Sequence, residues 1–341
     1  MQEKRVRIVD IAEELGLSTA TVSNVIHGKT KKISDETVKR VQELLEKKQY
    51  IPSMAGILLA QNDSRMIGVV VNDHEKYEGH VLEDAYIASA LNELAREIEA
   101  AGYFMMVKVT KAWNEIARFA SMWNLEGMIV IGFCGQDYRK LKDATHVPFV
   151  VYDGFFTEPA RMCNITIDNR DGGRKIGNYF RELGHERALC ISDNHICMDL
   201  ERYQGFQEGM DGKTADFLEI PMQKQERRKF YEERLEFLKS YPAIFAVSDE
   251  YSLELVQFLR EKGLSVPKDI SVAGFDDNPL CEKLYPALTT IRQDRTQRAK
   301  LALKLLREQK EGMENYEDVV LPVTLVVRQS TAPVRREGFP C

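Results

Sequence analysis

The segment that decides the fold covers residues 8–26 and reads IVDIAEELGLSTATVSNVI. Its first half carries apolar residues at the spacing of one buried helix face, namely Ile8, Ile11, Ala12 and Leu15. Gly16 then ends this helix, and Leu17 turns inward. The pattern therefore predicts a short amphipathic helix that stops at a tight turn.

The second half of the segment predicts another short helix. Ser18 is a good N-cap, and the inner stripe of the helix consists of Val22, Val25 and Ile26. Two short helices joined by a tight turn that contains glycine form a helix-turn-helix. An ordinary helical hairpin would share these features, so the outward face has to separate the two interpretations.

The outward face of the second helix consists of small polar and methyl-bearing residues, namely Thr19, Ala20, Thr21, Ser23 and Asn24. A face that meets only solvent is usually rich in Glu and Lys, whereas hydroxyl, methyl and amide groups suit close approach to bases and phosphates. In this motif, such positions enter the major groove of DNA. The outward face favours a DNA reader over a plain hairpin.

Length and composition place the chain among globular proteins with two or three domains. It has 341 residues, 44% hydrophobic and 29% charged. No apolar run approaches the roughly twenty residues that span a bilayer, and the N-terminus lacks the apolar core of a secretory signal. The six cysteines are scattered, without a CxxC pair or a histidine at metal spacing. We expect a cytoplasmic protein with reduced thiols, no bound metal and no association with membranes.

The net charge of −6 is unevenly distributed along the chain. Residues 1–60 hold ten Lys and Arg against eight Asp and Glu, which leaves 37 against 45 for the remainder. Several cations flank the two helices where a phosphate backbone would run, namely Lys4, Arg5, Arg7, Lys29, Lys31 and Lys32. A mildly basic N-terminal region, residues 1–60, on an otherwise acidic chain favours binding of this region to a polyanion.

A third helix and a connecting segment follow. Ser34 caps a helix whose inner face is Val38, Val41, Leu44 and Leu45, and which closes a small domain near residue 48. After Pro52, the stretch MAGILLA (54–60) predicts a helix too short to be stable alone. It is either a linker that packs on the next domain or a hinge helix that orders on DNA and inserts a leucine into the minor groove.

From residue 67 the pattern changes to apolar strands that alternate with helices, which predicts parallel sheets covered on both faces. The first set of strands is 67–71, 104–109, 127–131 and 149–152. The second set is 164–167, 188–192, 243–247 and 271–275, and the chain closes with strands at 319–321 and 323–327. Expected helices cover 82–101, 172–183, 200–210, 250–262 and 295–308. Two halves of similar size predict a bilobed body, and no Gly-rich dinucleotide or phosphate-loop motif follows any strand, so we expect no nucleotide cofactor.

Several segments together resemble the LacI/GalR family of bacterial transcription regulators from residue 6 to about residue 331. They are VDIAEELGLSTATVSNVIHGK, SDETVKRVQELLEKKQYIPS, IGVVV, IDNRDGGRKIGNYFRELGHERALCI, ERYQGF, AIFAVSDE, SVAGFDD, LTTIRQD and LPVTLVVRQST. The resemblance implies an N-terminal all-α helix-turn-helix domain followed by a bilobed α/β domain of the periplasmic-binding-protein type. It further implies a homodimer, a pseudo-palindromic operator in double-stranded DNA, and a small-molecule effector, usually a sugar, held between the lobes.

The resemblance also assigns roles to single residues. Thr19, Ala20 and Asn24 would face bases, and Ser18, Thr21 and Ser23 would face phosphates. Leu59 matches the leucine that enters the minor groove, and Tyr50 matches the entry to the hinge. The effector-binding arginine corresponds to Arg202, and an acid that takes ligand hydroxyls corresponds to Asp276. Further positions at strand ends line the same cleft, namely Asp153, Asp168, Ser248 and Gln293.

Some positions depart from the family's pattern. The family usually has arginine where Asn24 stands, and because asparagine pairs with adenine whereas arginine prefers guanine, the half-site is expected to differ. Gly56 replaces the usual alanine in the short helix and costs it about 1 kcal/mol of helix propensity. The segment NDHEKYEGHVL (72–82) lacks the family's pattern, and we interpret His74 and His80 as part of a solvated loop.

Alternative roles remain open for several residues. Arg202 could instead pair with Glu201 or Glu208, and Trp113 could stack on a sugar or pack in the core. Asp277 is expected to cap the following helix.

The predicted organisation is a DNA-binding domain at 1–49, a hinge at 50–64, an effector-binding and dimerisation domain at 65–331 and a tail at 332–341. The leading interpretation is a ligand-controlled transcription regulator, most simply a repressor, without enzymatic activity. A sugar-binding protein of the periplasmic type would explain only residues 67–331 and needs an export signal. A sugar-acting α/β enzyme would want a phosphate loop or a metal cluster, and the sequence offers neither motif.

Overall fold

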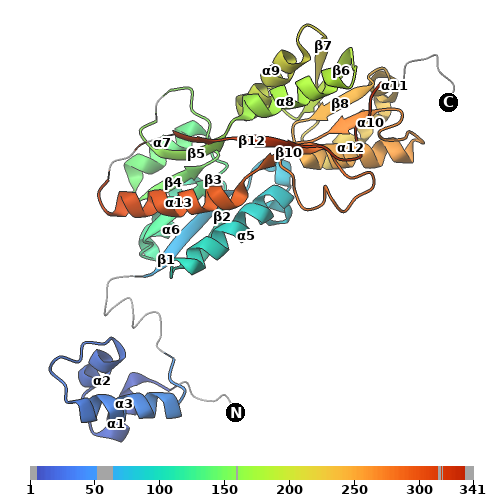
Figure 1. Cartoon of the computed structure of the whole chain (residues 1–341). Helices are drawn as coiled ribbons and strands as arrows, with labels where there is room; N and C mark the ends of the chain where they lie inside the picture. Colours follow the sequence, from blue (N-terminus) through green and yellow to red (C-terminus); the bar gives the residue numbers. More distant parts are fainter. Residues whose placement is uncertain (1–5, 52–63, 159, 314–315, 317, 335–341) are drawn as a thin grey trace. The chain divides into compact units, whose positions relative to one another are not determined.

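The chain folds into two compact units, residues 1–64 and residues 65–341 (Figure 1). The computed structural model describes residues 6–51, 64–158, 160–313, 316 and 318–334. The predicted short helix at 54–60, including Leu59, lies outside these residues. Among the residues described, no helix is both long enough and apolar enough to cross a membrane.

The first unit contains three helices around a small apolar core. They are α1 (Ile8–Leu15), α2 (Thr19–Ile26) and α3 (Asp35–Lys47). The turn after α1 depends on Gly16, whose φ of +66° lies in the left-handed region that favours glycine. The core consists of the residues that the periodicity placed inside, namely Ile11, Ala12, Val22, Val25, Val41 and Leu44. The predicted helix-turn-helix is therefore present.

Hydroxyl caps define where the second and third helices begin. The Ser18 Oγ accepts a hydrogen bond from the Thr21 backbone N–H at 3.1 Å, and the Ser34 Oγ accepts one from the Thr37 N–H at 3.3 Å. Each cap satisfies a backbone donor that has no partner within its helix. The N-terminal end of α2 is thus held rigidly by its own sequence.

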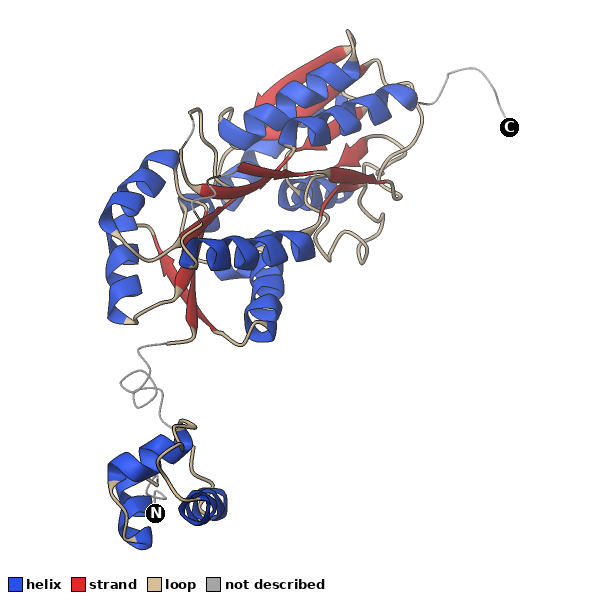
Figure 2. Cartoon of the chain, turned by 60° about the vertical axis from the view of Figure 1, so that its left-hand side comes forward, coloured by secondary structure: helices blue, strands red, loops and turns tan. Residues whose placement is uncertain are grey.

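The first lobe of the second unit is built on a six-stranded parallel sheet in the order β11-β5-β4-β3-β1-β2. Figure 2 shows strands of this unit with helices beside them. Its strands are β1 (Met66–Asn72), β2 (Phe104–Thr110), β3 (Gly127–Ile131), β4 (Phe149–Tyr152), β5 (Cys163–Ile167) and β11 (Asp318–Leu321). Its helical segments are η1 (Glu75–Tyr77), η2 (Val81–Glu83), α5 (Ala85–Ala100), α6 (Trp113–Met122), α7 (Gly135–Ala144) and α13 (Arg295–Lys310). Helix α13 packs against α5, and α6 packs against α7.

The second lobe is built on a four-stranded parallel sheet in the order β7-β6-β8-β9. Its strands are β6 (Arg187–Ser192), β7 (Thr214–Glu219), β8 (Ala243–Ala246) and β9 (Ser271–Ala273). Its helices are α8 (Asn169–Glu182), α9 (Cys197–Met210), α10 (Lys224–Glu233), α11 (Leu235–Lys239) and α12 (Asp249–Glu261). Two strands, β10 (Thr290–Gln293) and β12 (Val323–Val326), pair antiparallel beside the sheets.

The division of elements between the lobes differs from the expected one. Strand β5 was expected in the second half, but it pairs with β4 and with β11 in the first sheet. Helix α13 likewise packs on strands β3, β4 and β5. The chain therefore passes between the lobes three times, after β5, through β10 and through β12. Local periodicity predicts strands but carries no information about which sheet a strand joins.

Helices α8 and α9 approach each other so closely that only glycine fits between them. A Cβ added to Gly205 of α9 would lie 1.8 Å from the Arg170 carbonyl oxygen, and one on Gly173 of α8 would lie 1.8 Å from the Arg202 carbonyl oxygen. One turn along each helix, Gly177 and Gly209 make similar close contacts with backbone atoms. This backbone contact fixes the position of α9 on α8.

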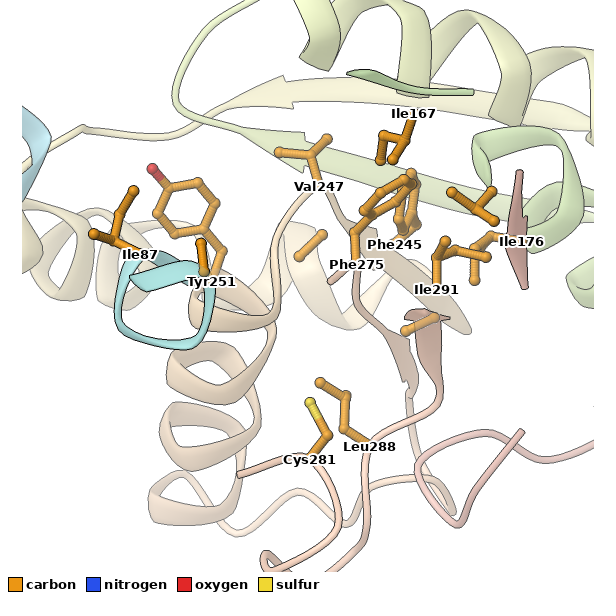
Figure 3. Packing of buried hydrophobic residues seen from close by; sticks show 14 of the residues in the cluster. Ile87, Ile167, Ile176, Phe245, Val247, Tyr251, Phe275, Cys281, Leu288 and Ile291 are labelled. Atoms are coloured by element: carbon orange, nitrogen blue, oxygen red, sulfur yellow. The ribbon is translucent and has the colours of Figure 1, made fainter. Parts of the chain in front are cut away.

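The hydrophobic core of the second unit reaches the region where the lobes meet. Figure 3 shows Phe245 and Phe275 among the buried isoleucines 167, 176 and 291. Phe275 is fully buried, and its ring lies against the place where Gly172 of α8 has no side chain. The ring of Phe275 also contacts a charged group, since the guanidinium carbon of Arg202 lies 3.9 Å from the ring centroid. The core thereby supports a charged side chain.

Candidate functional site

The outward face of α2 presents the small residues that the sequence analysis assigned to DNA. Thr19, Ala20 and Asn24 are exposed, and Thr21 and Ser23 are partly exposed. Ser18 and Thr21 share a hydrogen bond between their hydroxyl groups at 2.9 Å in addition to the cap. The face can therefore approach a nucleic-acid groove, and the role of each residue there stays a prediction.

Basic side chains surround this face. Arg7 before α1 is exposed, as are three lysines between α2 and α3, namely Lys29, Lys31 and Lys32. Tyr50 does not project freely, because its side chain packs partly buried against the core of the first unit. These cations suit the phosphate backbone that would flank a major groove.

The second unit contains a cavity of about 250 Å³ whose lining comes from both lobes. Its polar residues sit where parallel strands end: Asp153 follows β4, Asp193 follows β6, Ser248 follows β8 and Asp276 follows β9. Open parallel sheets bind ligands at these carboxyl ends. The full lining is His74, Lys76, Tyr77, Asp84, Ala85, Tyr86, Ile87, Ile131, Gly132, Asp153, Asp193, Asn194, Met198, Asp199, Arg202, Val247, Ser248, Glu250, Tyr251, Asp276 and Asn278.

Arg202 of α9 is fixed in the cavity wall and is only 7% exposed. Its Nε donates to the Asn169 Oδ1 at 2.9 Å, and its Nη1 donates to the Val247 carbonyl at 2.6 Å. The alternative ion pairs of Arg202 with Glu201 and with Glu208 are both absent among the described residues, and Glu208 pairs with Arg170. With two nitrogens anchored and the ring of Phe275 beneath it, the guanidinium is preorganised to donate from Nη2 to a ligand.

Asp153 belongs to a buried network on the first lobe. It forms an ion pair with Arg298 at 3.1 Å and accepts a hydrogen bond from the Tyr86 hydroxyl at 2.9 Å. Burial acts to raise the pKa of Asp153, but Arg298 and Arg202 outweigh it and lower the pKa. The carboxylate is therefore ionised, and the fully buried Arg298 behind it balances its charge.

Asp276 and Gln293 connect the second lobe to this network. The Gln293 Nε2 donates to the Asp276 Oδ1 at 2.6 Å, and its Oε1 accepts from the Arg298 Nη1 at 2.7 Å. Asp276 is 9% exposed, lines the cavity and has a φ of +117°. Burial raises its pKa well above the ordinary value, although Arg202 acts in the opposite direction.

The six predicted effector residues do not all reach the cavity. Four of them line it, namely Asp153, Arg202, Ser248 and Asp276. Gln293 is buried behind Asp276, and Asp168 is an exposed N-cap of α8 that accepts from the Asp171 N–H at 2.8 Å. Asp168 thus holds the start of α8, where the chain enters the second lobe.

The expected cap by Asp277 is wrong. Its carboxylate binds the Arg292 Nε at 2.6 Å and the Arg328 Nη2 at 2.7 Å. Residues 278–288 contain no helix that it could cap. Asp277 instead links the loop after β9 to Arg292 of β10 and to Arg328, which follows β12.

The divergent segment 72–82 contributes residues that the sequence analysis missed. His74, Lys76 and Tyr77 line the cavity, while the side chains of His74 and Lys76 also remain exposed to solvent and His80 contacts Glu83 at the surface. Lys76 faces the second lobe: Tyr251, Asp193 and Asp199, together with Tyr77, raise its pKa although burial acts to lower it.

Other missed residues are Asp84, Tyr86 and Arg298, and Trp113 does not line the cavity. The chain order of β1, η1 and α5 brings Asp84 and Tyr86 to the site, whereas Arg298 of α13 lies behind Asp153, and no local motif marks any of the three.

The lining of the cavity suits the binding of a polar ligand. Within the described ranges, no three or more His, Cys, Asp or Glu side chains are arranged to hold a metal ion. The five cysteines in these ranges are free thiols, namely Cys134, Cys163, Cys190, Cys197 and Cys281. The arrangement offers carboxylates, one anchored guanidinium and tyrosine rings around a small volume.

Comparison with known families fits both units. Residues 178–331 match the periplasmic binding protein-like domain, and residues 7–53 match the bacterial regulatory proteins of the lacI family. The chain belongs to the lacI family. LacI-family proteins are transcription regulators rather than enzymes, which confirms the predicted class.

LacI-family relatives align over almost the whole chain. The HTH-type transcriptional repressor PurR of Vibrio atlanticus (strain LGP32) is 26% identical over 95% of this chain and 98% of its own length. The PurR of Mannheimia succiniciproducens is 27% identical over 96% of this chain and 99% of its own.

Among solved structures, the Lac repressor dimer bound to operator and the anti-inducer ONPF superposes with a TM-score of 0.82. It is 23% identical and covers 96% of this chain and 100% of its own. A lacI-family regulator from Enterococcus faecium with bound ribose has a TM-score of 0.68 at 22% identity, over 79% and 100% of the two chains.

Proposed function

We propose that the protein is a sequence-specific transcriptional repressor whose operator affinity is set by a small-molecule effector bound in the interlobe cavity. The observation that carries this proposal is the combination of an exposed, small-residue face on α2 with a ligand-sized cavity in the second unit. A ligand that favours one arrangement of the lobes shifts DNA affinity by the difference in its affinity for the two states.

The DNA-binding role rests on the first unit. We assign base contacts to Thr19, Ala20 and Asn24, and phosphate contacts to the hydroxyls of Ser18, Thr21 and Ser23. Tyr50 and Leu59 are assigned to the hinge, within an organisation of 1–49, 50–64, 65–331 and 332–341. The exposed lysines between α2 and α3 support the assignment because they supply the salt-dependent part of the affinity.

The effector role rests on the cavity. A volume of about 250 Å³ suits a ligand smaller than drug-sized compounds, whose pockets measure about 300–1,000 Å³. Carboxylates accept paired hydroxyls, and the anchored Arg202 donates to oxygens, so a sugar or sugar derivative fits the lining. Structural relatives titled as complexes with ribose and with cellobiose support this ligand class.

We further propose a cytoplasmic homodimer that binds a two-fold symmetric operator. Strand β2 is an edge strand of the first sheet, and it exposes Phe104 by 59% and Val107 by 38%. Such an edge is a ready site for association with a second copy. The relative titled as a Lac repressor dimer supports the assembly. A periplasmic sugar-binding protein would leave the first unit without a role.

The direct test combines an operator titration with a ligand screen. DNA fragments selected from a random pool by the purified protein should share a pseudo-palindromic sequence. A thermal-shift screen with sugars, amino sugars, sugar phosphates and nucleobases should then identify a compound that changes the affinity for that fragment. Folded protein that binds all DNA fragments equally would overturn the proposed function.

Replacing Asn24 by alanine is expected to weaken binding to the selected operator by about 1–3 kcal/mol, because an asparagine amide can make a bidentate pair with adenine. Binding to random DNA should remain unchanged, since phosphate contacts supply it. Fluorescence anisotropy with both fragments measures the difference. Gln42→Ala removes an exposed amide from α3 and serves as the matched control. An equal loss on both fragments would mean that Asn24 contacts phosphate or supports packing.

A further inference from the structure

The cavity holds many more carboxylates than cations. Six acidic residues line it, whereas Lys76 and Arg202 are its two permanently charged bases. Burial lowers the pKa of His74, so this residue adds no positive charge at neutral pH. The lining is therefore strongly acidic and unfavourable for a phosphate or carboxylate ligand.

The protein itself compensates part of this charge. Asp153 is paired with Arg298. Asp199 accepts hydrogen bonds from the Ser192 Oγ and the Asn194 Nδ2, both at 2.9 Å, and lies 3.9 Å from Arg202. Lys76 faces Asp193 and Asp199, and this proximity contributes to the raised pKa of the lysine. Arg298 and Arg202 are therefore already engaged before any ligand binds, and Lys76 acts on these carboxylates through its charge.

Three other carboxylates have no ion-pair partner among the described residues. Asp84, Glu250 and Asp276 line the cavity, and none has an ion pair within 4.0 Å among the described residues. Asp84 caps α5 through a hydrogen bond from the Ile87 N–H at 2.9 Å. Asp276, although 9% exposed, has a hydrogen bond only at Oδ1, and in the described part of the chain nothing donates to its Oδ2.

These three residues come from opposite lobes and repel one another. Asp84 precedes α5 of the first lobe, whereas Glu250 and Asp276 belong to the second. Desolvation is the largest cause of the raised pKa of Glu250, and the negative charges of Asp84 and Glu254 raise this pKa further. The positive charges of Arg227 and Lys76 lower it more weakly. Asp84 also contributes to the raised pKa of Asp276. Glu250 and Asp276 therefore lose less free energy on ionisation when a positive charge enters between them and Asp84.

The geometry favours an organic cation over a metal ion. A metal would need its carboxylate ligands within about 2.0–2.6 Å of one point, and the described residues contain no such group of three. A protonated amine donates three hydrogen bonds and can sit on a larger scaffold that spans the gap. Tyr77 and Tyr251 also line the cavity, and each ring already has a cation over one face, Lys76 at 4.9 Å and Arg227 at 4.7 Å, which shows that these rings accept cations.

We propose that the effector is a small polyhydroxylated compound with a cationic amine, and that the amine binds between Asp84 of the first lobe and Glu250 and Asp276 of the second. This inference rests on the proposed function, because it takes the cavity as the effector site. Arg202 would bind hydroxyl oxygens of the same ligand. Because the amine joins carboxylates of both lobes, it would also hold the lobes together.

Matched ligand pairs test the proposal. Thermal shift and calorimetry on the full-length protein would compare D-glucosamine, D-galactosamine and D-mannosamine with their neutral parent sugars, with N-acetylglucosamine and with glucose 6-phosphate. We expect at least one amino sugar to bind at least tenfold more tightly than its neutral parent, and the sugar phosphate not to bind. Tighter binding of the neutral or phosphorylated compound would overturn the proposal. So would the absence of any amino-sugar response at about 20 mM, or an equal response to Mg²⁺ alone.

Variants locate the binding site of the amine. Glu250→Gln and Asp84→Asn should each weaken binding of the amino sugar at least tenfold, and asparagine preserves the helix cap of α5. Glu83→Gln is the matched control, because Glu83 adjoins Asp84 but does not line this cavity. Unchanged amine affinity in both cavity variants would overturn the assignment. Operator binding is measured separately, so its absence would contradict the proposed function without affecting the ligand result.

Discussion

Replacing Arg202 by alanine is expected to abolish effector binding while the ligand-free protein keeps its operator affinity. The anchored guanidinium donates charge-assisted hydrogen bonds, each worth about 1.5–3 kcal/mol. Removing it also takes away one positive charge that stabilises the ionised forms of Asp276 and Asp153, although Arg298 remains paired with Asp153. We expect the effector affinity to fall at least about 100-fold. Calorimetry with the compound that the ligand screen identifies measures this loss.

Two controls separate the loss of binding from a loss of structure. The substitution removes the partners of Asn169 and of the Val247 carbonyl, which costs about 1–3 kcal/mol of stability. Urea unfolding therefore accompanies the binding measurement. Arg170→Ala removes an exposed arginine on the neighbouring helix and should leave ligand binding unchanged. Wild-type ligand affinity in a folded Arg202→Ala protein would contradict the assigned role.

Replacing Gly205 by alanine is expected to lower the free energy of unfolding by about 3–5 kcal/mol. The added Cβ would lie 1.8 Å from the carbonyl oxygen of Arg170 and 2.7 Å from its carbonyl carbon. Both are backbone atoms of α8, so no side chain can move aside and the helices must separate. Chemical denaturation followed by circular dichroism measures the change.

The control for this substitution is Gln207→Ala, at an exposed position two residues further along α9. It should change stability by less than about 0.5 kcal/mol. A Gly205→Ala protein within about 1 kcal/mol of the parent would show that α8 and α9 can separate at little cost. The contact would then not determine the fold of the second lobe.

The sequence predicts best the elements whose pattern is uniform. Strands β3 and β4 begin and end where expected, because their apolar runs are fully buried on both faces. Strand β7 was not predicted, since TADFLE mixes charged and apolar residues at the edge of its sheet. Helix α8 begins at Asn169 rather than Gly172, because tertiary contact with α9 overrides the poor helix propensity of its glycines.

The candidate site was predictable in part for a similar reason. Arg202, Ser248 and Asp276 lie in segments that resemble the family, Asp153 lies at the end of a predicted strand, and the structure places all four at the cavity. The opposite wall comes from residues 74–86, which have no such pattern. Their position follows from the way the chain returns from β1 to α5 across the mouth of the sheet, and this path is a property of the tertiary fold.

The glycine contact between α8 and α9 has a mechanical consequence. A layer of side chains between two helices can deform and absorb small displacements, whereas backbone against backbone has no such slack. Arg202 sits at this contact, and α8 starts at the crossing after β5. A bound molecule that displaces the guanidinium of Arg202 would therefore move α8 and α9 together as one rigid unit. Because α8 begins directly after β5 of the first sheet, such a movement would act on the point where the chain leaves the first lobe.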